Sequence, residues 1–464
     1  MPPDQNASQM RSTWFLSSPV SMWPDYANTI TVLRFGAMRR FPGVAALLLA
    51  ASMSPAAQTP PATRVLTHRE QAPLQHRWIE QRFKTLLPSL MRREGIDMWV
   101  IVSREYNDDP VFRSMAPLTT YSSRRRTILV FFDRGGEKGV EHLSIGRFDY
   151  DGLFTLERTD NDGQWEGLRK VVEARDPKVI GVDVSELYSH ADGLTANERD
   201  NLLKAVGSKY AARVKSAEML AVGWLESKLP EETEAYRDVM RVAHQVIAEA
   251  FSNRVVVPGV TTNEDVAWWM RQRVAEMGLG QWFHPTITVW RKGGLPTPAP
   301  PGGFVIQRGD MLHCDFGLVY LGFSTDTQHN AYALLPGETD APQGLKDGLK
   351  FARPGATGNQ ALAGALAQAK TEGLTPSIYC HPIGYHGHAA GPPIGMTDYQ
   401  NGVPGRGDYI FRPNTWHSIE LNVTHKVKEW GDQPVRFALE EDAALLDSGW
   451  QWIAPRQTTF YLIW

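Results

Sequence analysis

Cysteine is scarce in this chain: Cys314 and Cys380 are the only two among 464 residues. Two cysteines are too few for a disulfide-rich scaffold, and no paired Cys-x-x-Cys motif indicates a zinc finger. Each cysteine directly precedes a residue with a chemically active side chain, Asp315 or His381. Because neighbouring residues of a strand point to opposite faces, we expect both thiols to pack in apolar surroundings. A disulfide between them is not favoured.

Strongly basic segments are also lacking. The formal net charge is −3, and no long run of lysine or arginine marks a nucleic-acid-binding surface. The first half of the chain has no glycine-rich phosphate loop. With 42% apolar and 21% charged residues, the composition is that of a soluble globular protein long enough for two domains. Nucleic acid is therefore not an expected partner.

Long apolar runs are confined to the N-terminal region. The stretch MRRFPGVAALLLAASMSPAAQ has two arginines, an apolar core too short to span a bilayer, and small residues suited to signal cleavage. We interpret residues 38–57 as a signal peptide, residues 1–37 as upstream read-through before a true start at Met38, and 58–66 as a disordered spacer. An N-terminal membrane anchor is the alternative. The mature protein is expected to be periplasmic or secreted, with no membrane partner after cleavage.

The remaining sequence divides into two parts of different pattern. In residues 67–218, strand-like runs such as DMWVIVS and RRTILVFFD alternate with helical segments, which predicts a smaller α/β domain. Residues 219–464 open with long amphipathic helices and continue with strand-like runs, among them DMLHCDFGLVY and VRFALEEDAALLD. This second pattern predicts an α+β domain with a mainly antiparallel sheet.

Two aspartates stand out in HCDFGLVYLGFSTDTQHNAY, where two strand-like runs flank a turn. If the turn is centred between Tyr320 and Leu321, Asp315 falls opposite Asp326 on the same face of a hairpin. Directly opposed like charges are destabilising, so such a pair requires a counter-cation. A shifted turn would instead place the two acids on opposite faces as solvated groups.

The run VRFALEEDAALLD contains a further candidate. Its odd-numbered positions form an apolar stripe interrupted only by Glu441, so strand alternation predicts that Glu441 points inward while Glu440 and Asp442 point outward. A buried carboxylate without a partner is costly, so Glu441 requires a cation or a proton. On an earlier strand, Glu420 shares its face with Ser418, as in a polar cavity, although a solvated face fits this strand equally well.

Three histidines lie close together in IYCHPIGYHGHAAGPP: His381, His386 and His388. Strand parity alone does not show which of them would bind a metal. Two aspartates, two glutamates and one histidine, drawn from successive strands, suit two divalent ions with shared carboxylate bridges. The oxygen-rich set favours manganese, with cobalt, iron or zinc as alternatives.

The order and spacing of these residues resemble the M24 metallopeptidase family, which includes methionine aminopeptidase, aminopeptidase P and prolidase. The resemblance rests on the motifs HCDFG, STD, HPIG, IEL and EED, and it covers most of residues 67–464. It implies a pita-bread fold for residues 219–464. The preceding α/β domain places the chain in the branch of aminopeptidase P, prolidase and creatinase. A homodimer is also implied by the resemblance.

The resemblance further implies roles for individual residues. The family pattern selects His381 as a metal ligand and His388 as a substrate-facing donor to the oxyanion, and it leaves His386 without a counterpart. Glu420 would move a proton to the leaving nitrogen. The implied metal ligands are Asp315, Asp326, His381, Glu420 and Glu441, with Asp326 and Glu441 bridging the two ions.

The function implied by the resemblance is hydrolysis of the N-terminal bond of short peptides, of the Xaa-Pro type, by an exported dinuclear enzyme. Three departures bear on specificity: the loop RKGGLPTPAPPGGF lacks the family's histidine, HAAGPP lacks the acid that usually follows the later histidine, and Leu439 stands two residues before Glu441, where the family often has an arginine. The alternatives are a metal-independent creatinase-like C–N hydrolase and a non-catalytic binding protein that retains the fold.

Overall fold

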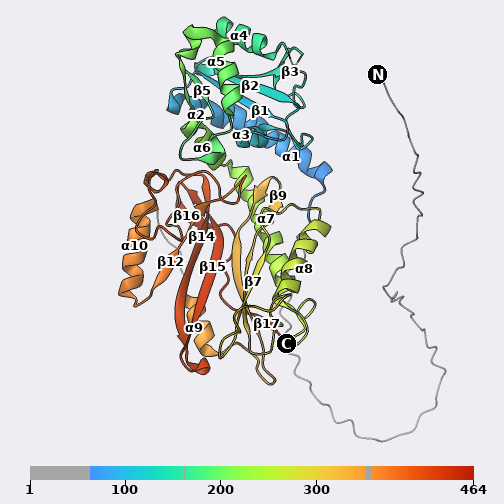
Figure 1. Ribbon diagram of the computed structural model, residues 1–464, viewed down its shortest axis with the longest axis vertical. Coiled ribbons are helices and arrows are strands. Elements are labelled where there is room, and N and C mark those ends of the chain that lie inside the picture. Colours follow the sequence, from blue (N-terminus) through green and yellow to red (C-terminus); the bar gives the residue numbers. More distant parts are fainter. Residues whose placement is uncertain (1–62, 161, 352–357) are drawn as a thin grey trace, which may run out of the picture. The chain divides into compact units, whose positions relative to one another are not determined.

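The computed structural model describes residues 63–160, 162–351 and 358–464 (Figure 1). The predicted upstream segment 1–37, the predicted signal peptide 38–57 and residues 58–62 of the predicted spacer lie outside the described residues. Within the described part of the chain, every helix is too short or too polar to cross a membrane.

A six-stranded mixed sheet forms the first half of the described chain (Figure 1). Its strands, in the spatial order β4-β3-β2-β1-β5-β6, are β1 (Met98–Arg104), β2 (Arg126–Asp133), β3 (Val140–Gly146), β4 (Thr155–Arg158), β5 (Ile180–Val182) and β6 (Val214–Ser216). The central strand β1 pairs antiparallel with β2 and parallel with β5. Helices cover both faces of this sheet, which explains why β1 is a continuous apolar run.

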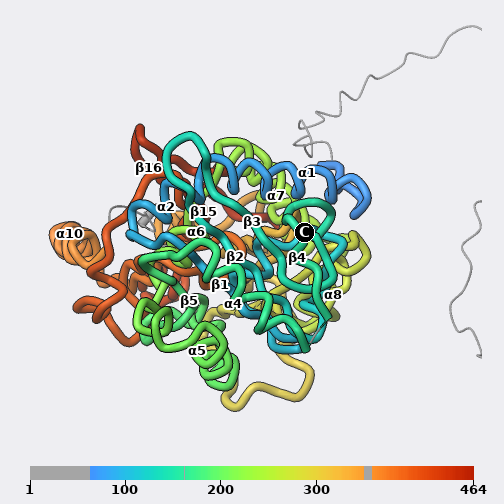
Figure 2. The backbone as a smooth tube through the Cα atoms, turned by 90° about the horizontal axis from the view of Figure 1, so that it is seen from above, coloured from blue at the N-terminus to red at the C-terminus, as the bar shows by residue number. Residues whose placement is uncertain are grey.

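Two groups of helices provide these layers. Helices α4 (Gln164–Arg175) and α5 (Ala196–Ala211) lie side by side over the face that carries Met98 and Val100 (Figure 1, Figure 2). The face that carries Trp99 packs against α1 (His68–Gln81), α2 (Leu87–Glu94), α3 (Pro110–Met115) and α6 (Glu218–Glu226). The fold class of this part is α/β, as the sequence predicts, while the boundary between residues 218 and 219 stays a prediction.

The fully buried side chain of Arg82 joins the first helices to the second half of the chain. Arg82 lies in the π-helical turn between α1 and α2, and its guanidinium donates to the carbonyl oxygen of Ser227 at 2.8 Å. It also pairs with Glu232 at 3.0 Å, on helix α7 (Pro230–Ala250). Glu232 in turn accepts a hydrogen bond from the backbone N–H of Leu229 at 2.7 Å, which caps the start of α7. A buried charge needs such pairing to be tolerated.

The second half of the chain is built on a nine-stranded sheet. Its strands are β7 (Thr286–Trp290), β8 (Met311–Phe316), β11 (Thr327–Ala333), β12 (Pro376–Ile378), β13 (His381–Pro382), β14 (Thr415–Val427), β15 (Gln433–Leu446), β16 (Gly449–Trp452) and β17 (Tyr461–Ile463). The main path runs β12-β14-β15-β11-β8-β7, and every pairing is antiparallel except that of β11 with β17. The predicted α+β class and mainly antiparallel sheet are confirmed.

The two faces of this sheet differ in what covers them. Helices α7 and α8 (Asn263–Glu276) lie against one face, where Leu312, Cys314 and Ala331 enter the largest apolar core (Figure 1). The opposite face is covered by apolar residues of α9 (Gln343–Phe351) only toward one end. Both cysteines are free and buried, as predicted. The part of the opposite face that α9 leaves uncovered carries the polar groups described next.

Candidate metal centre

A row of polar side chains crosses four adjacent strands on the face opposite α7. Asp315 on β8 is paired directly with Gln328 on β11, Gln328 with Glu440 on β15, and Glu440 with Glu420 on β14. Directly opposed residues of antiparallel strands project to the same side with their Cβ atoms about 4.5–5.5 Å apart. Three carboxylates and an amide therefore meet on one surface of the sheet.

Asp326 and His381 complete this cluster from the neighbouring row. Asp326 immediately precedes β11, and His381 on β13 is paired with Ser418, two residues before Glu420. The Nε2 atom of His381 lies 3.5 Å from Oδ2 of Asp326 and 3.5 Å from Oε1 of Glu440. We call the set Asp315, Asp326, His381, Glu420 and Glu440 the carboxylate cluster. Ligand-type atoms of Asp315, Asp326 and Glu440 lie within 4.8 Å of one another, and so do those of His381, Glu420 and Glu440.

The hairpin that carries the two aspartates turns one residue later than predicted. Phe323 pairs with Tyr320 in the short strands β9 (Val319–Tyr320) and β10 (Phe323–Ser324), which centres the turn between Leu321 and Gly322. Asp315 is consequently opposed by Gln328 rather than by Asp326. A shift of the centre by a whole residue moves the register by two positions and preserves parity, so both aspartates still point to one side, as predicted. The expectation that a shifted turn would place them on opposite faces is therefore wrong for this shift.

The prediction that Glu441 joins this cluster is wrong. In the observed register Glu441 is paired with Ile419, and its two carboxylate oxygens contact His329 and His244 on the helix-covered side of the sheet. The cluster member from this strand is Glu440, which faces Glu420. Glu440 therefore takes the place that the sequence prediction gave to Glu441.

The reason for this error is that β15 is buried on both faces. Glu440, Glu441 and Asp442 are only 1%, 3% and 0% exposed, so the apolar stripe does not distinguish an inner from an outer side. The useful signal is the turn that joins β14 and β15. That hairpin is centred at Trp430, and the same index rule used for the aspartates would have placed Glu440 opposite Glu420.

Other polar residues that the sequence prediction missed hold the cluster in place. Ser418 donates its hydroxyl to Oε1 of Glu440 at 2.7 Å, and Gln328 donates its amide to Oε2 of the same carboxylate at 3.0 Å. The amide oxygen of Gln328 is in turn 2.9 Å from Nε2 of His313. Glu440 is thus fixed on both oxygens by partners that are themselves buried.

The electrostatics of the carboxylate cluster show repulsion between like charges. Burial raises the pKa of Asp315 to about 7, and the nearby charge of Glu440 adds to the rise. The same two causes raise the pKa of Glu420 to about 8 and that of Asp326 well above its ordinary value. Burial alone would lower the pKa of His381, but the adjacent Asp326 and Glu440 carboxylates raise it well above the usual range. Without a cation, the cluster therefore retains protons.

The donor atoms of the cluster fit a metal centre. Oδ1 of Asp326 and Nε2 of His381 are buried and have no hydrogen-bond partner in the described part of the chain. Buried polar atoms are almost always paired, so atoms left free in a polar cluster indicate a ligand that completes them. Four carboxylates and one imidazole are donors that Mn²⁺ and related divalent ions accept.

The histidine-rich loop separates its three histidines by environment. His388 is exposed, and its ring centroid lies 4.6 Å from that of the buried His381. His386 contacts His190 instead, at a centroid distance of 4.5 Å, and is not part of the groups of metal-type ligands found in the described chain. Gly387, between His386 and His388, must lack a side chain, because an added Cβ would lie only 2.3 Å from the ring of Trp282. The three histidines thus lie in different surroundings, and the division into ligand, substrate-facing residue and bystander that the family resemblance implies stays a prediction.

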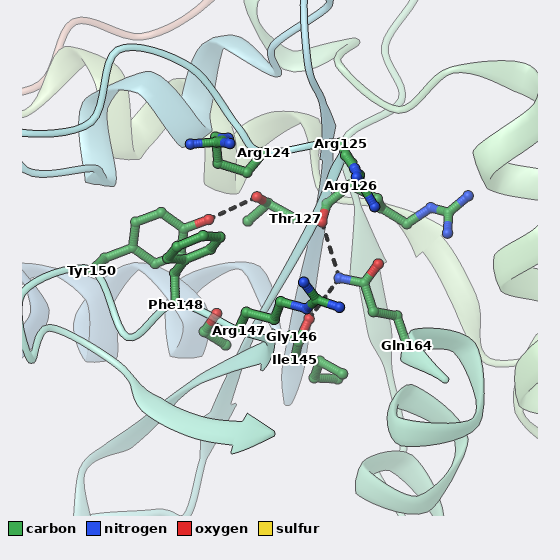
Figure 3. A pocket seen from close by; sticks show the side chains of 11 residues that line it. Arg124, Arg125, Arg126, Thr127, Ile145, Gly146, Arg147, Phe148, Tyr150 and Gln164 are labelled. Atoms are coloured by element: carbon green, nitrogen blue, oxygen red, sulfur yellow. Dashed lines mark hydrogen bonds between the residues drawn. The ribbon is translucent and has the colours of Figure 1, made fainter. Parts of the chain in front are cut away.

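The pocket shown in Figure 3 is separate from the carboxylate cluster. It lies on the first sheet, has a volume of about 110 Å³ and is lined by Arg124, Arg125, Arg126, Arg147, Phe148 and Tyr150 among others. Arg126 is already paired with Glu198 at 2.7 Å, and Arg124 lies 3.9 Å from Glu105. Because acids of the protein itself occupy these arginines and no cluster residue lines the pocket, it is not the candidate metal centre.

Comparison with known proteins identifies the relatives of this chain. Residues 234–440 match the model of metallopeptidase family M24. A protein of Mycoplasma pneumoniae named "Putative Xaa-Pro aminopeptidase" is 28% identical over 145 residues, which is 31% of this chain and 38% of that relative. A protein of the same name from Mycoplasma genitalium is 25% identical over 143 residues. The matched segment thus spans well under half of either curated relative.

Solved structures resemble a larger part of the chain. The X-Pro aminopeptidase from Thermotoga maritima superposes with a TM-score of 0.57 at 16% identity and covers 81% of this chain and 99% of its own. The Xaa-Pro dipeptidase from Bacillus anthracis gives a TM-score of 0.51 at 16% identity, with coverage of 85% and 100%. The chain therefore has the pita-bread fold preceded by an α/β region.

The fold is that of the solved X-Pro aminopeptidase and Xaa-Pro dipeptidase structures, and the carboxylate cluster is a candidate metal centre within it. Residues 234–440 of this chain are similar to metallopeptidase family M24. The matched range ends at Glu440 and includes the other four residues of the cluster.

The exchange of Glu441 for Glu440 can be tested with two matched variants. Glu440→Gln should weaken Mn²⁺ binding by about tenfold or more, because it removes a charged donor at the centre of the cluster. Glu441→Gln, one residue away on the same strand, should leave Mn²⁺ binding within about twofold of wild type. Equilibrium dialysis with metal analysis measures both, and loss of Mn²⁺ in Glu441→Gln alone would reverse the assignment.

Proposed function

We propose that this protein is a dinuclear metallopeptidase that hydrolyses the N-terminal bond of short peptides with proline in the second position. The observation that carries the proposal is the buried carboxylate cluster, in which four acids and one histidine converge although their charges repel. Such a site is stable at neutral pH only with protons or cations to compensate it. The names of the relatives and neighbours, which refer to Xaa-Pro aminopeptidases and dipeptidases, support the substrate class.

Asp315, Asp326, His381, Glu420 and Glu440 would hold two divalent ions, with manganese favoured by the oxygen-rich set. Bound there, the ions would supply Lewis acidity and lower the pKa of water into the neutral range. The central position of Glu440, whose Oε1 and Oε2 are oriented by Ser418 and Gln328, suits a carboxylate shared between two ions. Asp326 is the second candidate for a carboxylate shared between the two ions, because its oxygens lie close both to Asp315 and Glu440 and to His381.

Glu420 and His388 are the residues we assign to proton transfer and to orientation of the substrate. Glu420 is partly exposed, unlike Glu440, so its carboxylate can exchange protons with groups in the open part of the site. His388 is exposed, but ring contacts with Trp282 and Tyr379 remove part of its imidazole from water; this desolvation, together with the charge of His381, lowers the pKa of His388 to about 4. A neutral imidazole still carries one N–H, which can donate to a substrate carbonyl oxygen.

The intact cluster also weighs against the two alternatives considered from the sequence. A metal-independent C–N hydrolase has no need for four converging carboxylates, and a binding protein that had lost catalysis has no reason to keep buried charges that destabilise it. Neither alternative is favoured by a feature of the described residues.

Turnover of a peptide panel tests the proposed activity. With Mn²⁺ present, the protein should release the first residue from Xaa-Pro-Xaa peptides or split Xaa-Pro dipeptides, and a chelator should abolish turnover until Mn²⁺ is restored. Matched peptides with alanine in place of proline serve as the control for specificity. Bound Mn²⁺ without turnover of any peptide in the panel would refute the proposal, whereas cleavage of only one peptide length would define the mode of action.

The different environments of His388 and His386 lead to a second test. His388→Ala should reduce kcat by about tenfold or more with little change in bound Mn²⁺, because it removes a donor to the oxyanion but no metal ligand. His386→Ala, two residues away in the same loop, should keep most activity and all of the metal. Steady-state kinetics with metal analysis distinguishes them, and loss of metal in His386→Ala would overturn both assignments.

The segment 38–57 supports the further proposal that the enzyme is exported and acts in the periplasm or outside the cell. The expected mature chain begins near residue 58. Fractionation of the producing cells, followed by mass spectrometry of the intact protein, measures this directly. A full-length chain found only in the cytoplasm would show that the segment is not a signal peptide.

A further inference from the structure

We propose that His244, His329 and Glu441 form a second metal-binding site, separate from the carboxylate cluster, that takes a zinc-type divalent ion. The three residues come from α7, β11 and β15 and meet on the helix-covered side of the sheet. One ligand-type atom from each lies within 4.8 Å of the other two. We call this set the imidazole site.

The distances within the imidazole site suit one ion. Oε1 of Glu441 is 2.5 Å from Nε2 of His329, and Oε2 is 2.9 Å from Nε2 of His244. The two imidazole rings have their centroids 4.8 Å apart and are inclined by 53°. Zinc holds nitrogen and oxygen donors at about 2.0–2.2 Å, which sets neighbouring donors roughly 3.3 Å apart in a tetrahedron. Displacements below about 1 Å would bring the three donors to that spacing.

The donor chemistry differs from that of the carboxylate cluster. Two histidines and one glutamate form a ligand set typical of zinc, with a fourth position left for water. The carboxylate cluster instead contains four carboxylates and a single imidazole, which favours manganese. Glu440 and Glu441 are adjacent in sequence but point to opposite faces of the sheet, so the two sites share a strand and no ligand.

A hydrogen-bond partner already orients one ring of the imidazole site. The hydroxyl of Tyr461 lies 3.3 Å from Nδ1 of His329, the nitrogen that would not contact the ion. Without metal, both histidines donate Nε2–H to Glu441, and Nδ1 of His329 accepts from Tyr461. With metal, Nε2 provides its lone pair to the ion and the proton moves to Nδ1, which then donates to the tyrosine oxygen. Each ring changes tautomer, and no net proton is gained or lost.

The different burial of the three ligands lets an ion reach the imidazole site and favours tight binding once it is there. The side chain of His244 is 19% exposed, whereas those of His329 and Glu441 are 2% and 4% exposed. An ion can therefore enter beside His244 and be bound deeper by the other two. Once bound, it would connect α7 to two central strands more than 80 residues away in sequence. Such a cross-link stabilises the folded chain by an amount that grows with the logarithm of the metal affinity.

The experiment isolates the imidazole site by first disabling the other one. The full chain with Glu440→Gln is stripped with a chelator and titrated with Zn²⁺ by equilibrium dialysis, alongside Glu440→Gln/His244→Gln. A third protein, Glu440→Gln/His76→Gln, is the matched control, because His76 is a partly exposed helix residue whose Nε2 lies 3.9 Å from Glu80. His244 is chosen because it is the most exposed of the three ligands and its replacement is least disruptive to folding.

The proposal predicts that Glu440→Gln binds one equivalent of Zn²⁺ and that the His76 control binds it equally well. Glu440→Gln/His244→Gln should bind this equivalent at least tenfold more weakly. Zn²⁺ should also raise the Tm of the first and third proteins but not of the second. Equal Zn²⁺ binding by the first two proteins would overturn the proposal, as would the absence of any bound Zn²⁺ in Glu440→Gln. If Glu440→Gln does not fold, His244→Gln and His76→Gln are compared in the otherwise unchanged chain. Loss of one Zn²⁺ equivalent in His244→Gln but not in His76→Gln supports the proposal, and no loss in His244→Gln overturns it.

Discussion

The convergence of four carboxylates on one buried surface is the constraint on which the second half of this protein depends. Their repulsion and loss of hydration oppose folding, and the pKa values of Asp315, Asp326 and Glu420 rise accordingly. The rest of the sheet provides the rigidity that keeps them together. Strands β8, β15 and β14 fix Asp315, Glu440 and Glu420 in a single row, and Ser418 and Gln328 hold both oxygens of Glu440. A site of this kind is stable because its ligands lie on strands rather than on loops.

On the opposite side of the same strands, a buried carboxylate is stabilised in a different way. Glu441 is as deeply buried as Glu440, but it has two imidazole partners. Burial by itself would raise its pKa, yet His244 and His329 lower it to about 2. One strand thus carries a glutamate held by a hydroxyl and an amide toward the open face, and a glutamate held by two imidazoles toward helix α7.

Much of this protein could be predicted from its sequence because local patterns are strong. Apolar alternation and helix boundaries predicted the main strands and helices, and the free buried state of both cysteines followed from strand alternation. Four of the five residues in the carboxylate cluster were also predicted, from hairpin geometry and from motif spacing. Asp315 and Asp326 remained on one side even though the turn falls one residue later, because a whole-residue shift keeps parity.

The sequence by itself determined the fold class, the order of the elements and the residue types of the site, because these depend on periodicity and on chemistry carried by short segments. Only the tertiary structure decided between Glu440 and Glu441, because both faces of β15 are buried and an apolar stripe then carries no direction. The register of β14 and β15, a contact between residues 20 positions apart at Glu420 and Glu440, supplied that direction. It likewise brought His244 and His329 to Glu441, a meeting of distant segments that no local pattern encodes.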